Sequence, residues 1–169
     1  MLVFDFMEAL SNYFSHEFRV YYEDTDSGGI MYYANFLKFA ERGRTEALRD
    51  IGLSQQDLSE KDGLNFIVKS CYINYVKPAK LDDTVVVKTL FKRVQQTSCV
   101  VVQSLICNGF LLAELEVVVV CVKKNHEDSL VPAKIPLDIA SKIRQNNKSV
   151  VPLVAHSSVT MKTYSNFNK

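Results

Sequence analysis

Two carboxylates, with a single residue between them, lie in a short polar segment, where either could take part in catalysis. Asp24 and Asp26 lie within residues 23–29, and the Asp, Ser and Gly residues of this segment predict a turn. A carboxylate placed opposite a carbonyl group can attack it or activate a water molecule. Gly28 and Gly29 would let the backbone approach a substrate closely, because they carry no Cβ. The alternative interpretation is that both acids only shape the turn.

The segment after the turn predicts a helix whose first residues could stabilise an oxyanion. Apolar residues recur every three or four positions between residues 33 and 51, which indicates a helix with one buried face. Near Tyr33 and Ala34 the backbone N–H groups would be unpaired and would lie at the positive end of the helix dipole, where a carbonyl oxygen is polarised. Gly43 lies within this helix and predicts a close approach to a sheet, and Gly52 predicts a left-handed helix end.

Strand patterns account for most of the remaining chain. The pair Asn108-Gly109 separates two apolar runs, which is a strong hairpin signal because both turn residues need a positive φ angle. Ser54 and Asp57 predict the start of a second, short helix. The expected fold is α+β, with one long helix covering a five-stranded antiparallel sheet. The five expected strands are residues 16–22, 64–76, 81–94, 98–107 and 110–123.

Runs of valine predict apolar side chains on both faces of this sheet. Residues 85–87, 100–102 and 117–120 are all valine, although a sheet with one face in water should alternate apolar and polar residues. One helix covers only one face, so we expect a second copy of the protein to cover the other and the chain to form a homo-oligomer. The alternative is that the strands curl around the helix and leave some valines exposed.

Length and composition favour a single cytoplasmic domain. The 169 residues carry a net charge of +1, which gives no electrostatic basis for binding nucleic acid or an anionic membrane surface. No apolar stretch is long enough to span a membrane, and residues 1–10 lack the pattern of a secretory signal. The four cysteines form no CxxC pair, so we expect reduced thiols and no metal site. We expect an N-terminal arm at residues 1–14, a domain at 15–144 and a loosely ordered tail at 145–169.

Common catalytic motifs are absent from the sequence. It contains no GxGxxG, GxxxxGK(S/T), GxSxG or HExxH motif. None of His16, His126 and His156 stands with a candidate Ser or Cys nucleophile at a spacing that suggests a catalytic triad. An enzyme with this sequence would therefore work with carboxylates and backbone dipoles.

Residues 18–36, in which Asp-x-Asp-x-x-Gly leads into the helix, closely resemble the hotdog-fold acyl-CoA thioesterases. The similarity continues through residues 41–46, 75–83 and 118–122 and spans residues 16–138. The nearest group is the bacterial Tol–Pal-associated thioesterases, relatives of 4-hydroxybenzoyl-CoA thioesterase. The resemblance implies a five-stranded sheet wrapped around a central helix, protomers that join their sheets edge to edge, and dimers that pair into homotetramers.

The resemblance also implies an active site at the dimer interface. Asp26 matches the family's catalytic carboxylate, which acts as a nucleophile or as a general base on water. The backbone N–H that polarises the thioester carbonyl falls at Tyr33, where many relatives have His, and a Tyr side chain is a poor base at neutral pH. Glu41 matches a position facing the acyl pocket, and Ser98 matches a hydroxyl residue near the thioester, although either could be an ordinary helix-surface or strand residue. Candidates for binding the phosphates of coenzyme A are Lys80, Lys92, Arg93, Lys123 and Lys124.

The predicted function is hydrolysis of an acyl-CoA thioester to a free acid and coenzyme A, without a metal or another cofactor. The alternative is a non-catalytic module or scaffold in lipid metabolism that binds acyl-CoA or an acyl carrier protein. A hotdog dehydratase is disfavoured, because such sites pair His with a carboxylate and no His lies near the predicted helix. Release of a free thiol from acyl-CoA distinguishes the first two functions.

Overall fold

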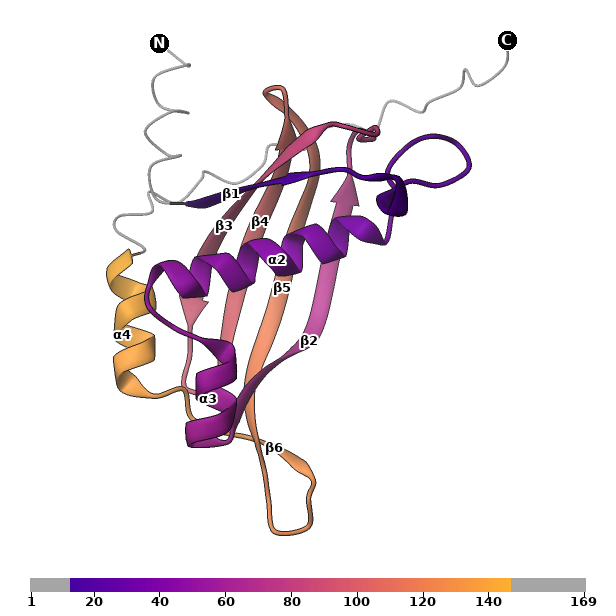
Figure 1. Ribbon diagram of the computed structural model, residues 1–169. Coiled ribbons are helices and arrows are strands. Elements are labelled where there is room, and N and C mark those ends of the chain that lie inside the picture. Colours follow the sequence, from indigo (N-terminus) through magenta and orange to yellow (C-terminus); the bar gives the residue numbers. More distant parts are fainter. Residues whose placement is uncertain (1–12, 147–169) are drawn as a thin grey trace, which may run out of the picture.

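An antiparallel sheet forms the body of the protein (Figure 1). The computed structural model describes residues 13–146, and the predicted arm and tail lie almost entirely outside these residues. The strand order is β1-β3-β4-β5-β2, and β6 pairs with β5. The five predicted strands are confirmed, and β6 is an addition to the predicted five-stranded sheet. The strands are β1 (Phe14–Arg19), β2 (Leu64–Tyr75), β3 (Thr84–Val94), β4 (Ser98–Cys107), β5 (Phe110–Lys124) and β6 (Leu130–Pro132).

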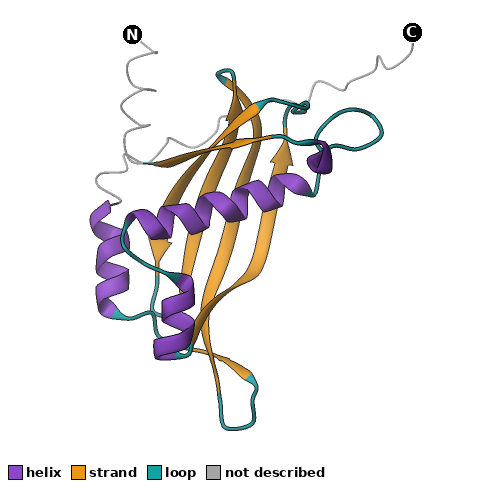
Figure 2. Ribbon diagram, viewed as in Figure 1, coloured by secondary structure: helices purple, strands orange, loops and turns teal. Residues whose placement is uncertain are grey.

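Helices cover one face of this sheet (Figure 2). The predicted long helix, α2, lies across the strands, and the predicted short helix, α3, follows it. The Ser54 hydroxyl accepts a hydrogen bond from the Asp57 N–H, which is the cap expected at the start of α3. A further helix, α4, was not predicted. The helices are α2 (Asn35–Asp50), α3 (Gln55–Asp62) and α4 (Leu137–Asn146), with a short 3-10 turn, η2 (Tyr22–Asp24), ahead of them.

Helix α2 lies close enough to the sheet that one position admits no side chain. A Cβ atom on Gly43 would lie 2.5 Å from Val87 Cγ1, which confirms the predicted close approach. The helix begins two residues later than predicted. Tyr33 belongs instead to a turn that is closed by a hydrogen bond from the Asn35 N–H to the Tyr32 carbonyl. It ends before Gly52, whose φ of 74° confirms the predicted left-handed end.

The valine runs place apolar side chains on both faces of the sheet, as predicted. In β4, Val101 is buried on the helix side, whereas Val100 and Val102 point to the opposite face and are only partly buried. Asn108 and Gly109 have φ angles of 49° and 79°, which confirms the predicted hairpin between β4 and β5. The outer face of the sheet therefore carries apolar surface that the helices leave uncovered.

Helix α4 covers part of the same face of the sheet as the predicted long helix, and its contribution was not predicted. Ile139, Ala140 and Ile143 are buried in one cluster with Leu48 of α2. Their spacing of one and three residues, after Pro136, is a helix signal that the sequence analysis missed. No helix in residues 13–146 is long and apolar enough to cross a membrane.

Strand β2 lies at an edge of the sheet. It pairs with β5, and among the described residues its other side has no strand partner. Large side chains on it are open to solvent, among them Val68 at 52 %, Tyr72 at 71 % and Tyr75 at 43 % exposure. An exposed edge strand of this kind can pair with another chain.

Candidate active site

Asp24 is a buried carboxylate that holds the turn before α2. It is 2 % exposed, and its Oδ2 accepts a hydrogen bond from the Tyr21 N–H at 3.0 Å. Its carbonyl oxygen accepts hydrogen bonds from the Tyr32 N–H and from the Asn35 side chain. Asp24 therefore shapes the turn and ties it to the first residue of α2, in agreement with the turn-forming interpretation.

Asp26 has the opposite environment. It is exposed, and its Oδ1 accepts a hydrogen bond from the Gly28 N–H at 2.7 Å. The backbone of the same turn adds a hydrogen bond from the Asp26 N–H to the Ile30 carbonyl. Oδ2 has no hydrogen-bond donor among the described residues. One carboxylate oxygen is thus held by the turn, while the other is open to a ligand.

The two glycines of the turn differ in what they permit. Gly29 has a φ of 72°, a left-handed conformation that favours glycine. A Cβ on Gly28 would lie 3.0 Å from Asp26 Oδ1, so a larger residue there would press on the carboxylate. Both glycines therefore border Asp26, and their contact with a substrate stays a prediction.

The start of α2 offers backbone N–H groups near this carboxylate. Tyr33 and Ala34 come just before the helix, and their N–H groups have no backbone acceptor among the described residues. A side-chain hydrogen bond with Tyr33 and, more weakly, the negative charge of Asp26 raise the pKa of Tyr32. The Thr25–Met31 β-bridge and the hydrogen bond from the Asp26 N–H to the Ile30 carbonyl close the turn of Asp26 just before the segment that leads into α2.

Aromatic side chains connect the start of α2 to the end of β2. The Tyr75 hydroxyl donates a hydrogen bond to the Tyr33 carbonyl at 3.0 Å, and the two rings meet edge to face at 6.3 Å. Tyr75 also contacts Phe36, with ring centroids 5.4 Å apart. The candidate site therefore lies where the exposed edge strand ends.

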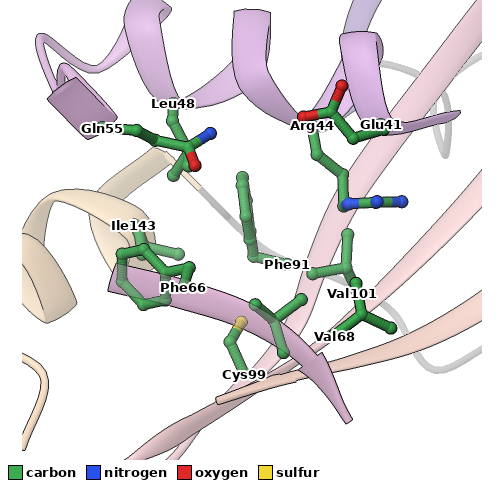
Figure 3. A pocket seen from close by; sticks show the side chains of 11 residues that line it. Glu41, Arg44, Leu48, Gln55, Phe66, Val68, Phe91, Cys99, Val101 and Ile143 are labelled. Carbon is green, nitrogen blue, oxygen red and sulfur yellow. The ribbon is translucent and has the colours of Figure 1, made fainter. Parts of the chain in front are cut away.

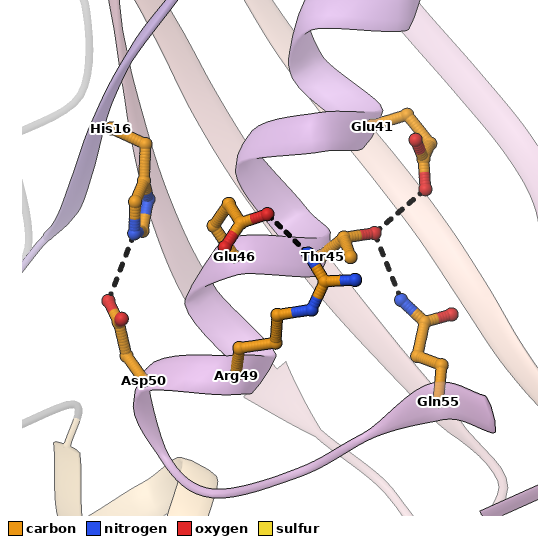
Figure 4. A network of polar contacts seen from close by, with 7 residues as sticks. All are labelled: His16, Glu41, Thr45, Glu46, Arg49, Asp50 and Gln55. Carbon is orange, nitrogen blue, oxygen red and sulfur yellow. Dashed lines mark hydrogen bonds and ion pairs between the residues drawn. The ribbon is translucent and has the colours of Figure 1, made fainter. Parts of the chain in front are cut away.

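Glu41 lies farther along α2, at the rim of a cavity of about 90 Å³ (Figure 3). The Thr45 hydroxyl donates a hydrogen bond to Glu41 Oε1 at 2.8 Å and accepts one from Gln55 Nε2 at 3.1 Å (Figure 4). Arg44 stands beside Glu41 on the same wall. The remaining lining is mostly apolar and includes Leu48, Phe66, Phe91, Cys99, Val101 and Ile143.

Ser98 lies at the other end of the sheet. Its hydroxyl donates a hydrogen bond to Gln95 Oε1 at 2.8 Å, in the turn between β3 and β4. It pairs with Val120 of β5, whereas Tyr75 of the candidate site pairs with Ala113. The seven positions between these two β5 residues span about 23 Å. Within one chain, the structure does not bring Ser98 to the candidate site.

Asp26, Gly28 and Gly29 thus share one turn, Tyr33 follows this turn just before α2, and Glu41 lies farther along the helix. Arg44 was not predicted as a site residue, although Glu41, three residues before it, was. Among the described residues, no three His, Cys, Asp or Glu side chains are grouped to hold a metal ion. The chemistry available at the turn is that of one carboxylate and of backbone donors.

Two curated relatives share much of their length with this chain. The acyl-CoA thioesterase YbgC of Haemophilus influenzae is 45 % identical over 113 residues, which are 67 % of this chain and 83 % of the relative. The acyl-CoA thioester hydrolase YbgC of Escherichia coli is 39 % identical over 128 residues, which are 75 % of this chain and 92 % of the relative. The prediction of an enzyme of the thioester hydrolase class is confirmed.

Solved structures agree with the predicted hotdog fold. A probable thioesterase from Bartonella henselae has a TM-score of 0.68 at 31 % identity and covers 73 % of this chain and 99 % of its own. The 4-hydroxybenzoyl-CoA thioesterase from Pseudomonas has a TM-score of 0.72 at 20 % identity and covers 77 % of this chain and 98 % of its own, a likeness that concerns the fold alone. The sequence pattern of the Thioesterase-like superfamily matches residues 20–143, and the chain belongs to this family.

Proposed function

We propose that this protein hydrolyses acyl-CoA thioesters to a free acid and coenzyme A. The observation that carries the proposal is the open Oδ2 of Asp26, in the turn that precedes Tyr33, whose N–H has no backbone acceptor among the described residues. A thioester carbonyl between them would have a carboxylate on one side and a hydrogen-bond donor on the other. The names of the two curated relatives support the same substrate class.

Asp26 would begin the reaction in one of two ways. As a nucleophile, its carboxylate oxygen attacks the thioester carbon, the thiolate of coenzyme A leaves, and water hydrolyses the resulting anhydride. As a general base, it takes a proton from a water molecule that attacks the same carbon. In both routes the Tyr33 N–H and the positive end of the α2 dipole would stabilise the oxyanion. Solvent-labelled oxygen distinguishes the routes, because label enters Asp26 only through the anhydride.

The substitution Asp26→Asn tests this proposal. It removes the negative charge but keeps an oxygen that can accept the Gly28 hydrogen bond, so the turn should persist. We expect thiol release from a panel of acyl-CoA substrates to fall at least about a hundredfold, the lower end of what a general base contributes. Glu23→Gln is the matched control, because Glu23 is an exposed carboxylate of the same segment and should be dispensable.

Two results would contradict the proposal. Near-normal turnover by a folded Asp26→Asn variant would rule out its role in catalysis. Saturable binding of acyl-CoA by the wild-type protein without release of thiol would instead identify a non-catalytic binding module.

The proposed assembly joins two copies along β2, which would place the site at a subunit boundary. β2 ends at Tyr75, whose hydroxyl binds the main chain of Tyr33, and its outer edge has no strand partner within residues 13–146. The partly buried valines of the outer face would pair such dimers into a tetramer. Sedimentation equilibrium at micromolar concentration tests the assembly, and a monomer would contradict it.

Lys80 is the proposed contact for a phosphate of coenzyme A. It forms an isolated β-bridge with Ile30, so the backbone places it beside the turn that carries Asp26. Lys92 and Lys124, by contrast, form ion pairs with carboxylates of their own surroundings. We expect Lys80→Ala to raise KM for acyl-CoA while leaving kcat nearly unchanged, because the phosphates do not take part in the chemistry.

A further inference from the structure

One side of α2 leads from the candidate oxyanion site to the cavity. Positions three and four apart on a helix lie above one another on the same side. A row with this spacing starts at the proposed oxyanion donor, continues past the rim of the cavity and ends at its apolar lining. The row consists of Tyr33, Leu37, Glu41, Arg44 and Leu48.

Strand β2 also contributes residues near both ends of this row, although α2 lies across the strands. At one end, the Tyr75 hydroxyl binds the Tyr33 carbonyl. In the middle, the positive charge of Arg44 lowers the pKa of Cys71, although burial raises it more. At the other end, Phe66 lines the cavity together with residues of α2. Residues of α2 and β2 therefore occur both beside the candidate site and in the lining of the cavity.

Arg44 is a cation without an ion-pair partner among the described residues. Its Nη1 donates a hydrogen bond to Gln103 Oε1 at 2.8 Å, and no carboxylate within residues 13–146 lies at ion-pair distance from it. Burial lowers the pKa of Arg44, and the charge of Glu41 opposes this shift only in part. The guanidinium lies between α2 and the sheet, beside Val101 (Figure 3). It thus keeps donors to offer at the wall of an otherwise apolar cavity.

Gln103 holds Arg44 in a defined position. The side chain of Gln103 is fully buried. Its Nε2 donates one hydrogen bond to the Ala40 carbonyl at 2.8 Å and another to Thr89 Oγ1 at 2.9 Å. Because both amide hydrogens are used, the amide cannot flip, and Oε1 must face the guanidinium. The cation is therefore pre-organised by the core of the protein.

We propose that the cavity receives the far end of the acyl group, and that Arg44 selects acyl groups whose far end carries an oxygen, as a carboxylate or a hydroxyl. This inference rests on the proposed thioesterase function, because that function places the thioester carbonyl at Tyr33. The cavity of about 90 Å³ is large enough for a terminal group of the acyl chain.

The preference follows from desolvation. A terminal methyl group would displace water from the guanidinium and leave its buried N–H groups without acceptors, which is costly. A terminal oxygen would accept a charge-assisted hydrogen bond from the same groups. A terminal hydroxyl could also donate a hydrogen bond to the Glu41 carboxylate. A terminal carboxylate could instead accept two parallel hydrogen bonds from the guanidinium. The eight positions from Tyr33 to Glu41 span about 12 Å, so acyl chains of medium length would reach.

The test compares acyl-CoA substrates that differ only at the far end of the chain. We would measure kcat/KM for octanoyl-CoA, its ω-hydroxy derivative and octanedioyl-CoA, and repeat the comparison with the dodecanoyl series. We expect the wild-type protein to prefer an oxygen-terminated substrate by at least about tenfold, the size of one hydrogen bond to a charged group. Comparison of the ω-hydroxy substrate with the substrate that ends in a carboxylate shows which oxygen group is preferred.

Matched variants assign this preference to Arg44. Arg44→Met should remove the preference, whereas Arg42→Met should keep it, because Arg42 stacks on Phe39 and belongs to another side of α2. A readout independent of turnover is the alkylation rate of Cys71, which an oxygen-terminated acyl-CoA should slow in the wild-type protein but not in Arg44→Met.

The inference is overturned if methyl-terminated substrates are used equally well at both lengths, or if Arg44→Met lowers kcat/KM for all substrates by the same factor. Thiol release in either case would leave the proposed hydrolase function standing. If no acyl-CoA released thiol, the hydrolase function would fail, and selective protection of Cys71 would still support the inference as a binding site.

Discussion

Gly43→Ala tests how closely α2 lies on the sheet. An alanine Cβ would lie 2.5 Å from Val87 Cγ1 and 3.1 Å from Val87 Cβ, and Val87 is fully buried on a central strand. In an exposed helix interior the same change stabilises by about 1 kcal/mol. Overpacking a buried contact costs about 1–3 kcal/mol, and an approach this short belongs to the upper half of that range. We therefore expect Gly43→Ala to lower the free energy of unfolding by about 1–2 kcal/mol.

A second substitution shows whether the clash is the cause. Val87→Ala destabilises the protein by itself because it opens the core, but it removes the Cγ1 atom that the new Cβ would meet. In this background Gly43→Ala should become stabilising, by up to about 1 kcal/mol, because only the gain in helix propensity is left. The expected coupling between the two positions is about 2 kcal/mol, a large value for a pair in contact.

Urea unfolding followed by circular dichroism measures all four proteins of this cycle, with equal m-values as the check on comparability. The decisive quantity is the sign of the Gly43→Ala effect in each background. If the alanine stabilises the protein that retains Val87, α2 does not approach the sheet as the structure shows, and the account of how Arg44 is positioned fails with it.

Three further predictions concern the turn, the second helix and the thiols. Asp24→Ala should lower the free energy of unfolding by about 1 kcal/mol, because it removes the acceptor of the part-buried Tyr21 N–H; an unchanged urea midpoint would contradict this. Ser54→Ala should cost about 1 kcal/mol through loss of the cap of α3, seen as a fall in Tm of about 2–4 °C. Iodoacetamide at mildly alkaline pH should label Cys71 in the native protein and leave Cys99 unlabelled, because burial raises the pKa of Cys99 to about 12 and its reactive thiolate becomes abundant only as pH rises toward that value. Labelling of both at equal rates, measured by peptide mass spectrometry, would refute the last prediction.

Elements whose limits are set by neighbouring residues could be predicted from the sequence. The hairpin at Asn108-Gly109 and the left-handed end at Gly52 depend on φ angles that local sequence favours. At the start of α2, the Asn35 side chain donates a hydrogen bond to the Asp24 carbonyl, eleven residues away, and no local pattern shows this contact. Such a contact appears only once the turn has folded back on the helix.

The candidate site also contains residues whose positions local sequence could predict and residues whose positions depend on how the chain packs. Asp26 and Tyr33 are seven residues apart in the connection between β1 and α2, so the chain itself keeps them in one region. The position of Ser98 depends on the register between β4 and β5, which the valine runs do not specify. Arg44 stands among charged residues of a helix, and its direction depends on how α2 rests on the sheet. Gln103 was the available signal, because a polar side chain in an apolar strand needs a buried partner.

The position of Arg44 depends on the residue before it. A Cβ on Gly43 would come within 3.4 Å of Thr89 Oγ1, the atom to which Gln103 donates one of its hydrogen bonds. An outward shift of α2 by a few tenths of an ångström would therefore disturb the acceptor that holds the guanidinium, and the 2.8 Å bond from Arg44 would lengthen with it. The turn of Asp26 is held by its own backbone hydrogen bonds, and those bonds do not pass through this contact. The glycine thus links the stability of the fold to selection at the far end of the acyl group, while the carboxylate chemistry at the start of the helix is left largely independent of it.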